Sequence, residues 1–257
     1  MIIATWEEFC GKALFPSAPM AMTLGVFDGV HRGHRILMEE LEGEGLFSAV
    51  FTFRRNPAEL TGHKTFKGNI LTMDQKLERL EKLGVNSTII IDFSHDFSKL
   101  TGVEFFARIT DRVDLRKVVL GENHRLGNKG RMGAREAKHY LEKDGVEVKI
   151  IPSLREDEQV ISSTLIRELL HRGEFRRAAG LLGYDYSLDL GTAKPEQDKD
   201  GFRLKREACR QILPAEGTYP VLLEENQEFF ATKLILDDTY MRWNQNSDFP
   251  VKNIIFS

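Results

Sequence analysis

Residues 25–34 read GVFDGVHRGH and directly follow an apolar run, Met20–Leu24. This order suits an apolar strand, a glycine-bearing turn and a helix whose first turn carries His31 and His34. Backbone N–H groups at the start of a helix favour anions, and two imidazoles add side-chain donors at the same place. The stretch therefore predicts a phosphate-binding site at a strand-to-helix junction, as in proteins that bind a nucleoside triphosphate.

Two histidines at this spacing also suit a metal site. A zinc site needs a third ligand of suitable type, and the neighbouring sequence offers none. Asp28 and Gly29 form a turn ahead of the histidines, and Gly33 leaves room for a phosphate because it has no side chain. We therefore expect Gly25, Phe27, Asp28 and Gly33 to contact a nucleotide, and we expect no metal bound by the protein alone.

The composition is that of an ordinary globular protein. The chain has 257 residues, of which 41% are hydrophobic and 29% charged, and its net charge of −3 gives no case for nucleic-acid binding. Cys10 and Cys209 fit neither a metal nor a disulfide pattern. No apolar run approaches the ~20 residues that span a bilayer. We expect a cytoplasmic protein with neither nucleic-acid nor membrane partners.

Apolar, β-rich runs alternate with segments of helical period as far as residue 186. The expected strands are 21–27, 46–53, 87–91, 117–120 and 146–151, and the expected helices are 33–41, 74–83, 103–109, 135–143, 163–171 and 174–182. Such alternation predicts βαβ units, hence an α/β fold with a mainly parallel sheet. Ligands of open parallel sheets bind beyond the carboxyl ends of the strands, where GVFDGVHRGH is expected to lie.

The pattern changes after residue 186. A polar stretch at 194–201 reads as a loop. The short runs 218–223, 228–236 and 251–256 predict antiparallel strands. We therefore expect an α/β domain at 1–186 and a small β-rich domain at 187–257.

A second cluster of polar residues lies at 161–167, which read ISSTLIR. Ser162, Ser163 and Thr164 begin a predicted helix, and Arg167 follows one turn later. One hydroxyl suffices to cap a helix. Three hydroxyls suggest that they hold β- and γ-phosphates, with a charge-assisted contact from Arg167. A helix cap without further function is the alternative.

Two more loops follow predicted strands. Residues 121–127 read GENHRLG and place Asn123 where it could hold a ribose or a base edge. Residues 52–57 read TFRRNP and place Arg55 and Asn56 where they could bind an anionic acceptor. For both loops, a solvated surface segment is the alternative.

Together these motifs resemble the bacterial bifunctional riboflavin kinase/FAD synthetase family, in its N-terminal FMN adenylyltransferase half. The matching stretches are GVFDGVHRGH (25–34), the strand end TFxxxP (52–57), GENHRLG (121–127), ISSTLIR (161–167) and AAGLLGYDYSL (178–188). HxGH with ISSTxxR marks the wider nucleotidyltransferase superfamily, whereas the longer stretches narrow the resemblance to the flavin branch. The resemblance covers residues 20–188 and implies a Rossmann-like nucleotidyltransferase fold.

The resemblance implies that AMP is transferred from ATP, with Mg²⁺, to FMN, which gives FAD and pyrophosphate. His31 and His34 would contact the phosphates during the reaction. Arg167, with the hydroxyls of residues 162–164, would hold the departing pyrophosphate, and Asn123 would lie between nucleotide and flavin. The FMN phosphate oxygen is itself the nucleophile, so catalysis would rest on positioning and on neutralising charge.

Two departures from the family concern the acceptor. The family usually has Pro-His-Pro where this chain has Arg55, Asn56 and Pro57, and an aromatic residue where it has His124. We expect Arg55, Asn56 and His124 to form the acceptor side of the site. Another phosphorylated acceptor, or non-catalytic binding of flavin or nucleotide, remains an alternative.

A further departure concerns the C-terminal segment. The kinase half of the family carries a Gly-Phe-Pro-Thr-Ala-Asn motif that does not occur in this sequence. Residues 213–219, LPAEGTY, resemble a later barrel strand of that half. We therefore expect residues 187–257 to be a degenerate kinase-like domain, and the protein to be an FAD synthetase without riboflavin kinase activity.

Overall fold

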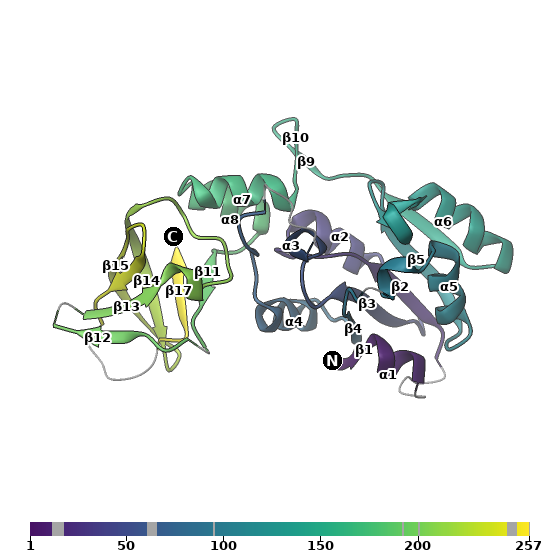
Figure 1. Ribbon diagram of the computed structural model, residues 1–257. Helices are drawn as coiled ribbons and strands as arrows, with labels where there is room; N and C mark the ends of the chain where they lie inside the picture. The colour runs from purple at the N-terminus through teal and green to yellow at the C-terminus, as the bar shows by residue number, and fades with distance from the viewer. Residues whose placement is uncertain are drawn as a thin grey trace. The chain divides into compact units, whose positions relative to one another are not determined.

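The computed structural model describes residues 1–11, 18–60, 66–94, 96–191, 193–199, 201–245 and 251–256 (Figure 1). The chain divides into two compact units, Met1–Phe66 with Lys76–Val160 and Lys67–Gln75 with Ile161–Ser257. The domain boundary expected between residues 186 and 187 stays a prediction.

The first unit is an α/β unit. Its strands are β1 (Ile2–Thr5), β2 (Met20–Leu24), β3 (Phe47–Phe53), β4 (Ser87–Ile91), β5 (Leu115–Gly121), β6 (Arg125–Leu126), β7 (Met132–Gly133), β8 (Glu147–Ile151), β9 (Arg155–Glu156) and β10 (Gln159–Val160). Its helices are α1 (Trp6–Gly11), α2 (Arg32–Glu39), α3 (Pro57–Leu60), α4 (Met73–Lys82, in this unit from Lys76 onward), α5 (Gly102–Thr110) and α6 (Ala134–Leu141), with the 3-10 helices η1 (Phe97–Lys99), η2 (Asn128–Gly130) and η3 (Glu142–Asp144).

Six parallel strands form its main sheet, in the order β1-β4-β3-β2-β5-β8. The chain proceeds from β2 through β3 to β4 on one side, and then continues through β5 to β8 on the other. The strand order therefore reverses between β2 and β5, as in Rossmann-like folds, and the predicted parallel sheet is confirmed. Ligands of open α/β sheets bind at such a reversal, beyond the carboxyl ends of the strands.

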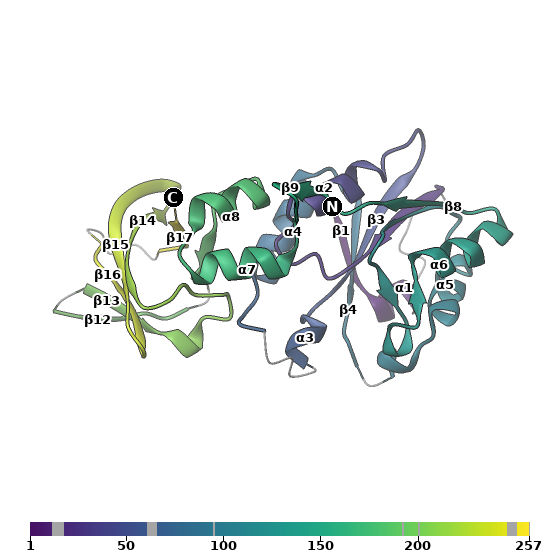
Figure 2. The same cartoon turned by 90° about the horizontal axis from the view of Figure 1, so that it is seen from above.

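Helices cover the main sheet and leave its central strands without solvent contact. Every residue of β2 and β4 is buried, which explains why these strands read as continuous apolar or small-residue runs. On one face, Trp6 and Phe9 of α1 and Phe105 of α5 join a core cluster with side chains of α6 and the strands. Figure 2 shows α1, α5 and α6 together on that side of the sheet.

The second unit combines two helices with an antiparallel sheet, and this sheet confirms the antiparallel strands predicted beyond residue 186. Its elements are α7 (Ser163–His171), α8 (Phe175–Leu182), β11 (Ser187–Asp189), β12 (Glu196–Asp198), β13 (Gly201–Lys205), η4 (Arg206–Ala208), β14 (Gly217–Glu225), β15 (Glu228–Leu236), β16 (Tyr240–Trp243) and β17 (Asn253–Phe256). The sheet order is β11-β17-β14-β15-β16-β13-β12.

Two local predictions were wrong. The strand expected over 21–27 ends at Leu24, because Phe27 adopts a left-handed backbone conformation with φ 49° that no strand accommodates. The loop expected over 194–201 contains β12, whose polar residues pair with β13 in an antiparallel ladder. Within the described residues, no helix is both long and apolar enough to span a bilayer.

Candidate active site

Residues 25–31 connect β2 to α2, and we refer to them as the β2–α2 turn. Phe27 has φ 49° and Val30 has φ 35°, beside Gly29 at φ 90°. Left-handed backbone is uncommon for residues other than glycine, and for a β-branched valine it is a genuine outlier. Such strain persists only where the surrounding structure enforces it, commonly at ligand sites.

His31 and His34 lie at the end of this turn, on the first turn of α2. His31 is the N-cap residue, and its carbonyl oxygen accepts a hydrogen bond of 2.7 Å from the His34 backbone N–H. The two imidazole rings stack with centroids 3.6 Å apart and an angle of 17° between their planes. The two histidines, three positions apart in the motif, are thus in direct ring contact in the structure.

Burial lowers the pKa of His31 from 6.5 to about 4. Burial, with the neighbouring charges of His31 and Lys76, lowers the pKa of His34 well below 6.5. Both rings are therefore neutral near pH 7. The Nδ1 atoms of both rings are buried and have no hydrogen-bond partner within the described part of the chain. Buried polar atoms without partners are rare, and here they point to a ligand that completes the site.

Two glycines let aromatic rings approach the backbone of this site. A Cβ on Gly33 would lie 3.3 Å from Cε1 and Nδ1 of His31, and a Cβ on Gly25 would lie 2.9 Å from Cζ of Phe27. The Phe27 ring meets His34 edge to face, with centroids 5.2 Å apart. Gly25, Phe27 and Gly33, expected as nucleotide contacts, are therefore also packing partners of the histidine pair.

A cavity of about 470 Å³ opens at the carboxyl ends of β2, β3 and β5. Its lining includes Phe53, Phe93 and Phe97, whose ring centroids lie 5.8, 6.1 and 6.2 Å apart pairwise. We call these three rings the aromatic wall. Apolar pockets with a few polar groups are the usual form of small-molecule sites, and aromatic rings favour flat, stacked ligands. The sequence analysis missed this wall, because phenylalanines beside strands read as core.

Asn123 and His124 line the same cavity from the loop after β5. The Asn123 amide donates a 3.0 Å hydrogen bond to Oγ of Ser153. Burial lowers the pKa of His124 from 6.5 to about 4, and its Nε2 atom is buried without a partner among the described residues. The fold thus brings Asn123 and His124 to one cavity with Gly25, which is far from both in sequence.

Arg55 and Asn56 are not among the residues found to line this cavity. The Arg55 guanidinium forms an exposed ion pair of 2.8 Å with Glu59. The Asn56 side-chain oxygen accepts a 3.1 Å hydrogen bond from the Ala58 N–H at the start of α3. Asn56 therefore has a local structural role, and its contact with an acceptor stays a prediction.

The hydroxyl cluster lies in the second unit. Ser162 is the N-cap of α7, and its Oγ accepts a 3.2 Å hydrogen bond from the Leu165 N–H. Ser163 follows it half-buried and Thr164 exposed, and Nε of Arg167 donates to the Gly68 carbonyl at 3.0 Å. The cap that was expected as the alternative therefore exists. That these residues meet the histidine pair on one nucleotide stays a prediction.

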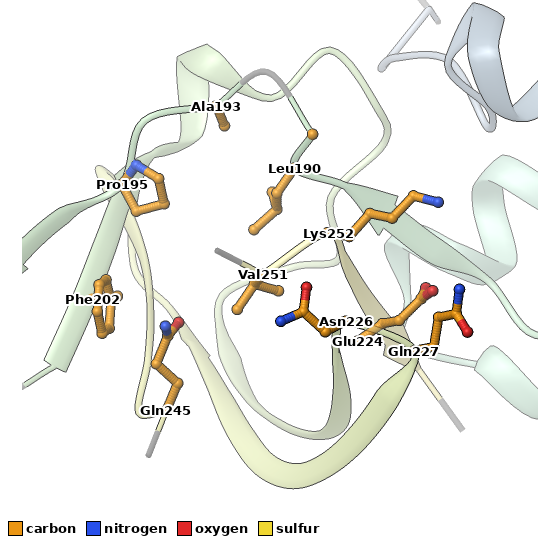
Figure 3. Close-up of a pocket in the computed structure, with 11 residues that line it drawn as sticks. Leu190, Ala193, Pro195, Phe202, Glu224, Asn226, Gln227, Gln245, Val251 and Lys252 are labelled. Carbon is orange, nitrogen blue, oxygen red and sulfur yellow. The ribbon is translucent and has the colours of Figure 1, made fainter. Parts of the chain in front are cut away.

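The second unit also has a cavity of its own, of about 570 Å³ (Figure 3). Apolar side chains such as Leu190, Phe202 and Val251 share its lining with Glu224 and Lys252. The Glu224 carboxylate accepts a 2.7 Å hydrogen bond from the Asn253 amide. Across the described residues of both units, no group of three or more His, Cys, Asp or Glu side chains is arranged to hold a metal ion.

Comparison with protein families settles the relationship of the chain. Residues 16–165, more than half of the chain, match the family described as FAD synthetase. The chain belongs to the FAD synthetase family. This match confirms the predicted family. At the level of the family, it also confirms that the protein is a nucleotidyltransferase enzyme.

Several relatives of this FAD synthetase family member carry the description bifunctional riboflavin kinase/FMN adenylyltransferase. The protein of Listeria monocytogenes is 33% identical over 172 residues, which cover 65% of this chain and 54% of that protein. The Bacillus subtilis protein is 28% identical over 225 residues, covering 83% of this chain and 70% of that protein. The chain therefore spans about half the length of the first relative and more of the second.

Among solved structures, one described as a macrolide-efflux protein from Streptococcus pneumoniae has a TM-score of 0.82 to this chain. It is 22% identical and covers 100% of this chain and 90% of its own. At that identity the likeness shows the fold alone.

Proposed function

We propose that this protein is an FMN adenylyltransferase, which transfers AMP from Mg-ATP to FMN and releases pyrophosphate. The observation that carries the proposal is the stacked, neutral pair His31 and His34 at the start of α2. The β2–α2 turn that presents the pair also lines the cavity with the aromatic wall. The descriptions of the relatives name the same activity.

On the nucleotide side, the imidazole N–H groups and backbone N–H groups at the start of α2 donate to phosphate oxygens. An FMN phosphate oxygen attacks the α-phosphorus, and the bond from that phosphorus to the bridging oxygen breaks. Pyrophosphate leaves with the electron pair, where Arg167 and the hydroxyls of residues 162–164 would hold it. Mg²⁺ enters with ATP as part of the substrate. Catalysis then rests on positioning and on donors aimed at developing charge.

On the acceptor side, the aromatic wall supports FMN as the substrate. The isoalloxazine ring is flat and mostly apolar, and it matches the stacked geometry that phenylalanine rings favour. Asn123 and His124 supply polar groups at the same cavity. Arg55 and Asn56 remain candidates for the FMN phosphate.

The direct test is FAD formation by the purified full chain from FMN and Mg-ATP, followed by chromatography with release of pyrophosphate. A His31→Ala variant should lose about 10²–10³-fold in kcat, as expected when one donor to a developing charge is removed. His139→Ala is the matched control, because His139 is exposed on α6. If the wild-type chain makes no FAD, the proposal fails.

We also propose that residues 187–257 do not phosphorylate riboflavin. The support is the missing Gly-Phe-Pro-Thr-Ala-Asn motif. Incubation of the purified protein with riboflavin and Mg-ATP should yield no FMN. Appreciable FMN formation would contradict this part of the proposal.

A different phosphorylated acceptor is the second candidate function. It is favoured by Asn56, whose oxygen is engaged at α3 where the family usually has histidine, and by the open Nε2 of His124. A panel of phosphorylated acceptors assayed with Mg-ATP separates the two. A non-catalytic binding protein is excluded if His31→Ala binds ATP as tightly as the wild type does, and only the wild type forms a product from ATP.

A further inference from the structure

Lys76 is buried on α4, with 6% of its surface exposed. Lysine is almost never buried unless it has partners. Its Nζ donates a 2.8 Å hydrogen bond to the Val26 carbonyl and lies 3.4 Å from Oγ1 of Thr52. The Thr52 hydroxyl donates to the same carbonyl at 3.1 Å. Two side chains from other elements, Lys76 and Thr52, thus hold the Val26 carbonyl near the start of the β2–α2 turn.

The place of this contact is informative, because the strained part of the turn begins at the next residue. Phe27 and Val30 both have positive φ values that their side chains disfavour. A backbone in such a conformation relaxes unless it is fixed at its ends. The end toward α2 is fixed by the helix, and the end toward β2 by Lys76 and Thr52.

The charges around Lys76 tie it to the histidine pair. Burial lowers the pKa of Lys76 from 10.5 to about 8, and the nearby Asp28 carboxylate opposes that shift. Asp28 is itself only 3% exposed. Lys76 in turn contributes to the lowered pKa of His34, together with burial and His31. The titratable groups that face Lys76 are therefore Asp28 of the turn and His34 of α2.

We propose that Lys76 is a positioning residue for adenylyl transfer, whose ammonium group fixes the Val26 carbonyl and thereby the turn that presents His31 and His34. This inference rests on the proposed function. Lys76 does not touch the reacting atoms in this role. It sets where the two imidazoles present their donors, and its charge adds to burial and to His31 in lowering the pKa of His34.

The inference predicts a distinct pH dependence. With a folded pKa of about 8, Lys76 loses its charge as the pH rises through that value. The attraction to the Val26 carbonyl weakens and Asp28 is left unbalanced, so kcat/KM of the wild-type protein should fall above about pH 8. If Lys76 only stabilised the fold, kcat/KM would not fall at alkaline pH as long as the protein stays folded. We call this fall the alkaline limb of the pH profile.

The test compares Lys76→Met, which keeps the apolar stem and removes the charge, with Lys76→Arg, which stays charged because arginine has a pKa above about 12. Lys76→Met should lower kcat/KM at neutral pH by about 10–100-fold and abolish the limb near pH 8. Lys76→Arg should recover most of that loss and move the limb upward. Lys82→Met on the same helix is the control, since Lys82 is exposed and pairs only with Glu78 among the described residues.

Two further measurements keep the inference testable. If Lys76→Met does not fold, Thr52→Val replaces it, and the loss of one donor to Val26 should lower kcat/KM by about 3-fold. If the wild-type chain makes no FAD, the proposed function fails. The same variants are then compared by their affinity for Mg-ATP. This affinity depends on the β2–α2 turn, independently of which acceptor the protein uses. An alkaline limb shared by wild type and Lys76→Met, or Mg-ATP affinity equal in all variants, overturns the inference.

Discussion

The imidazole rings of His31 and His34 stack in direct contact, with centroids 3.6 Å apart. Protonation of both rings would place two positive charges in contact in a largely buried site. Burial lowers the pKa of both rings, that of His31 to about 4, and the neighbouring His31 and Lys76 lower that of His34 further. Under the proposed function, the pair would therefore contact phosphates near neutral pH through hydrogen bonds rather than through charge.

The first prediction concerns the packing of Gly33 under His31. A Cβ at this position would lie 3.3 Å from two atoms of the His31 ring, so Gly33→Ala should displace the ring by a few tenths of an ångström. We expect kcat for FAD formation to fall by about 10-fold with little change in stability. Gly180→Ala on α8 is the control, since a Cβ there meets no atom of the described residues within 4 Å. Unchanged kcat in Gly33→Ala would show that the ring position is not critical.

The second prediction concerns the aromatic wall. Phe93 is half-buried and packs against Phe53 and Phe97. Phe93→Leu keeps an apolar side chain but removes the flat ring, so KM for FMN should rise by about 3- to 10-fold while KM for ATP stays constant. Steady-state kinetics with each substrate varied in turn measure both values. Phe229→Leu, at a side chain 57% exposed on β15, should change neither. A rise in KM for ATP alone would place the nucleotide, not the flavin, at the wall.

The third prediction concerns His124. Its buried Nε2 has no partner among the described residues, and an unsatisfied buried nitrogen costs about 1–3 kcal/mol. His124→Phe removes that atom and should raise the free energy of unfolding by about 1 kcal/mol. If the nitrogen contacts the acceptor, KM for FMN should rise about 3-fold in the same variant. Urea unfolding and steady-state kinetics measure the two effects, and a destabilised variant with unchanged KM would contradict both.

The fourth prediction concerns stability at acid pH. The pKa of His31 is about 4 in the folded chain and 6.5 when unperturbed, so the unfolded chain binds more protons between these values. Stability should therefore be complete above about pH 6.5 and fall as the pH drops toward 4, with about 3 kcal/mol lost through His31 alone. His34 and His124 act in the same direction.

Urea unfolding of the wild-type protein at about pH 7 and about pH 4.5 measures this loss. His31→Asn cannot titrate and should lose less, whereas His139→Asn, at an exposed position, should lose as much as the wild type. Equal losses in both variants would show that His31 is not the group responsible.

Local patterns were enough to predict β2, β3, β4, β5 and β8 of the main sheet and most of the longer helices. The strand Ser87–Ile91 and the helix Ser163–His171 lie where they were expected. An apolar run and a hydroxyl cap act on neighbouring residues, so the sequence itself carries the signal. β12 was missed for the complementary reason, since its polar residues form a strand only because β13 pairs with them.

The candidate site could be predicted only in part. Lys76 lies in a helix rich in charged residues and reads as solvent-exposed, yet it is buried against the β2–α2 turn. The aromatic wall combines Phe53 with two residues some forty positions later, which no local pattern connects.

By itself, the sequence determined the order of the motifs, the alternation that builds a parallel sheet, and the resemblance that the family match confirms. The tertiary structure alone decided that His31 and His34 are stacked and neutral, that His124 faces a cavity, and that Lys76 lies beneath the turn. The reason is physical. Spacing along the chain fixes which residues share a helix turn, whereas desolvation and the pKa values that follow from it depend on segments brought together by folding.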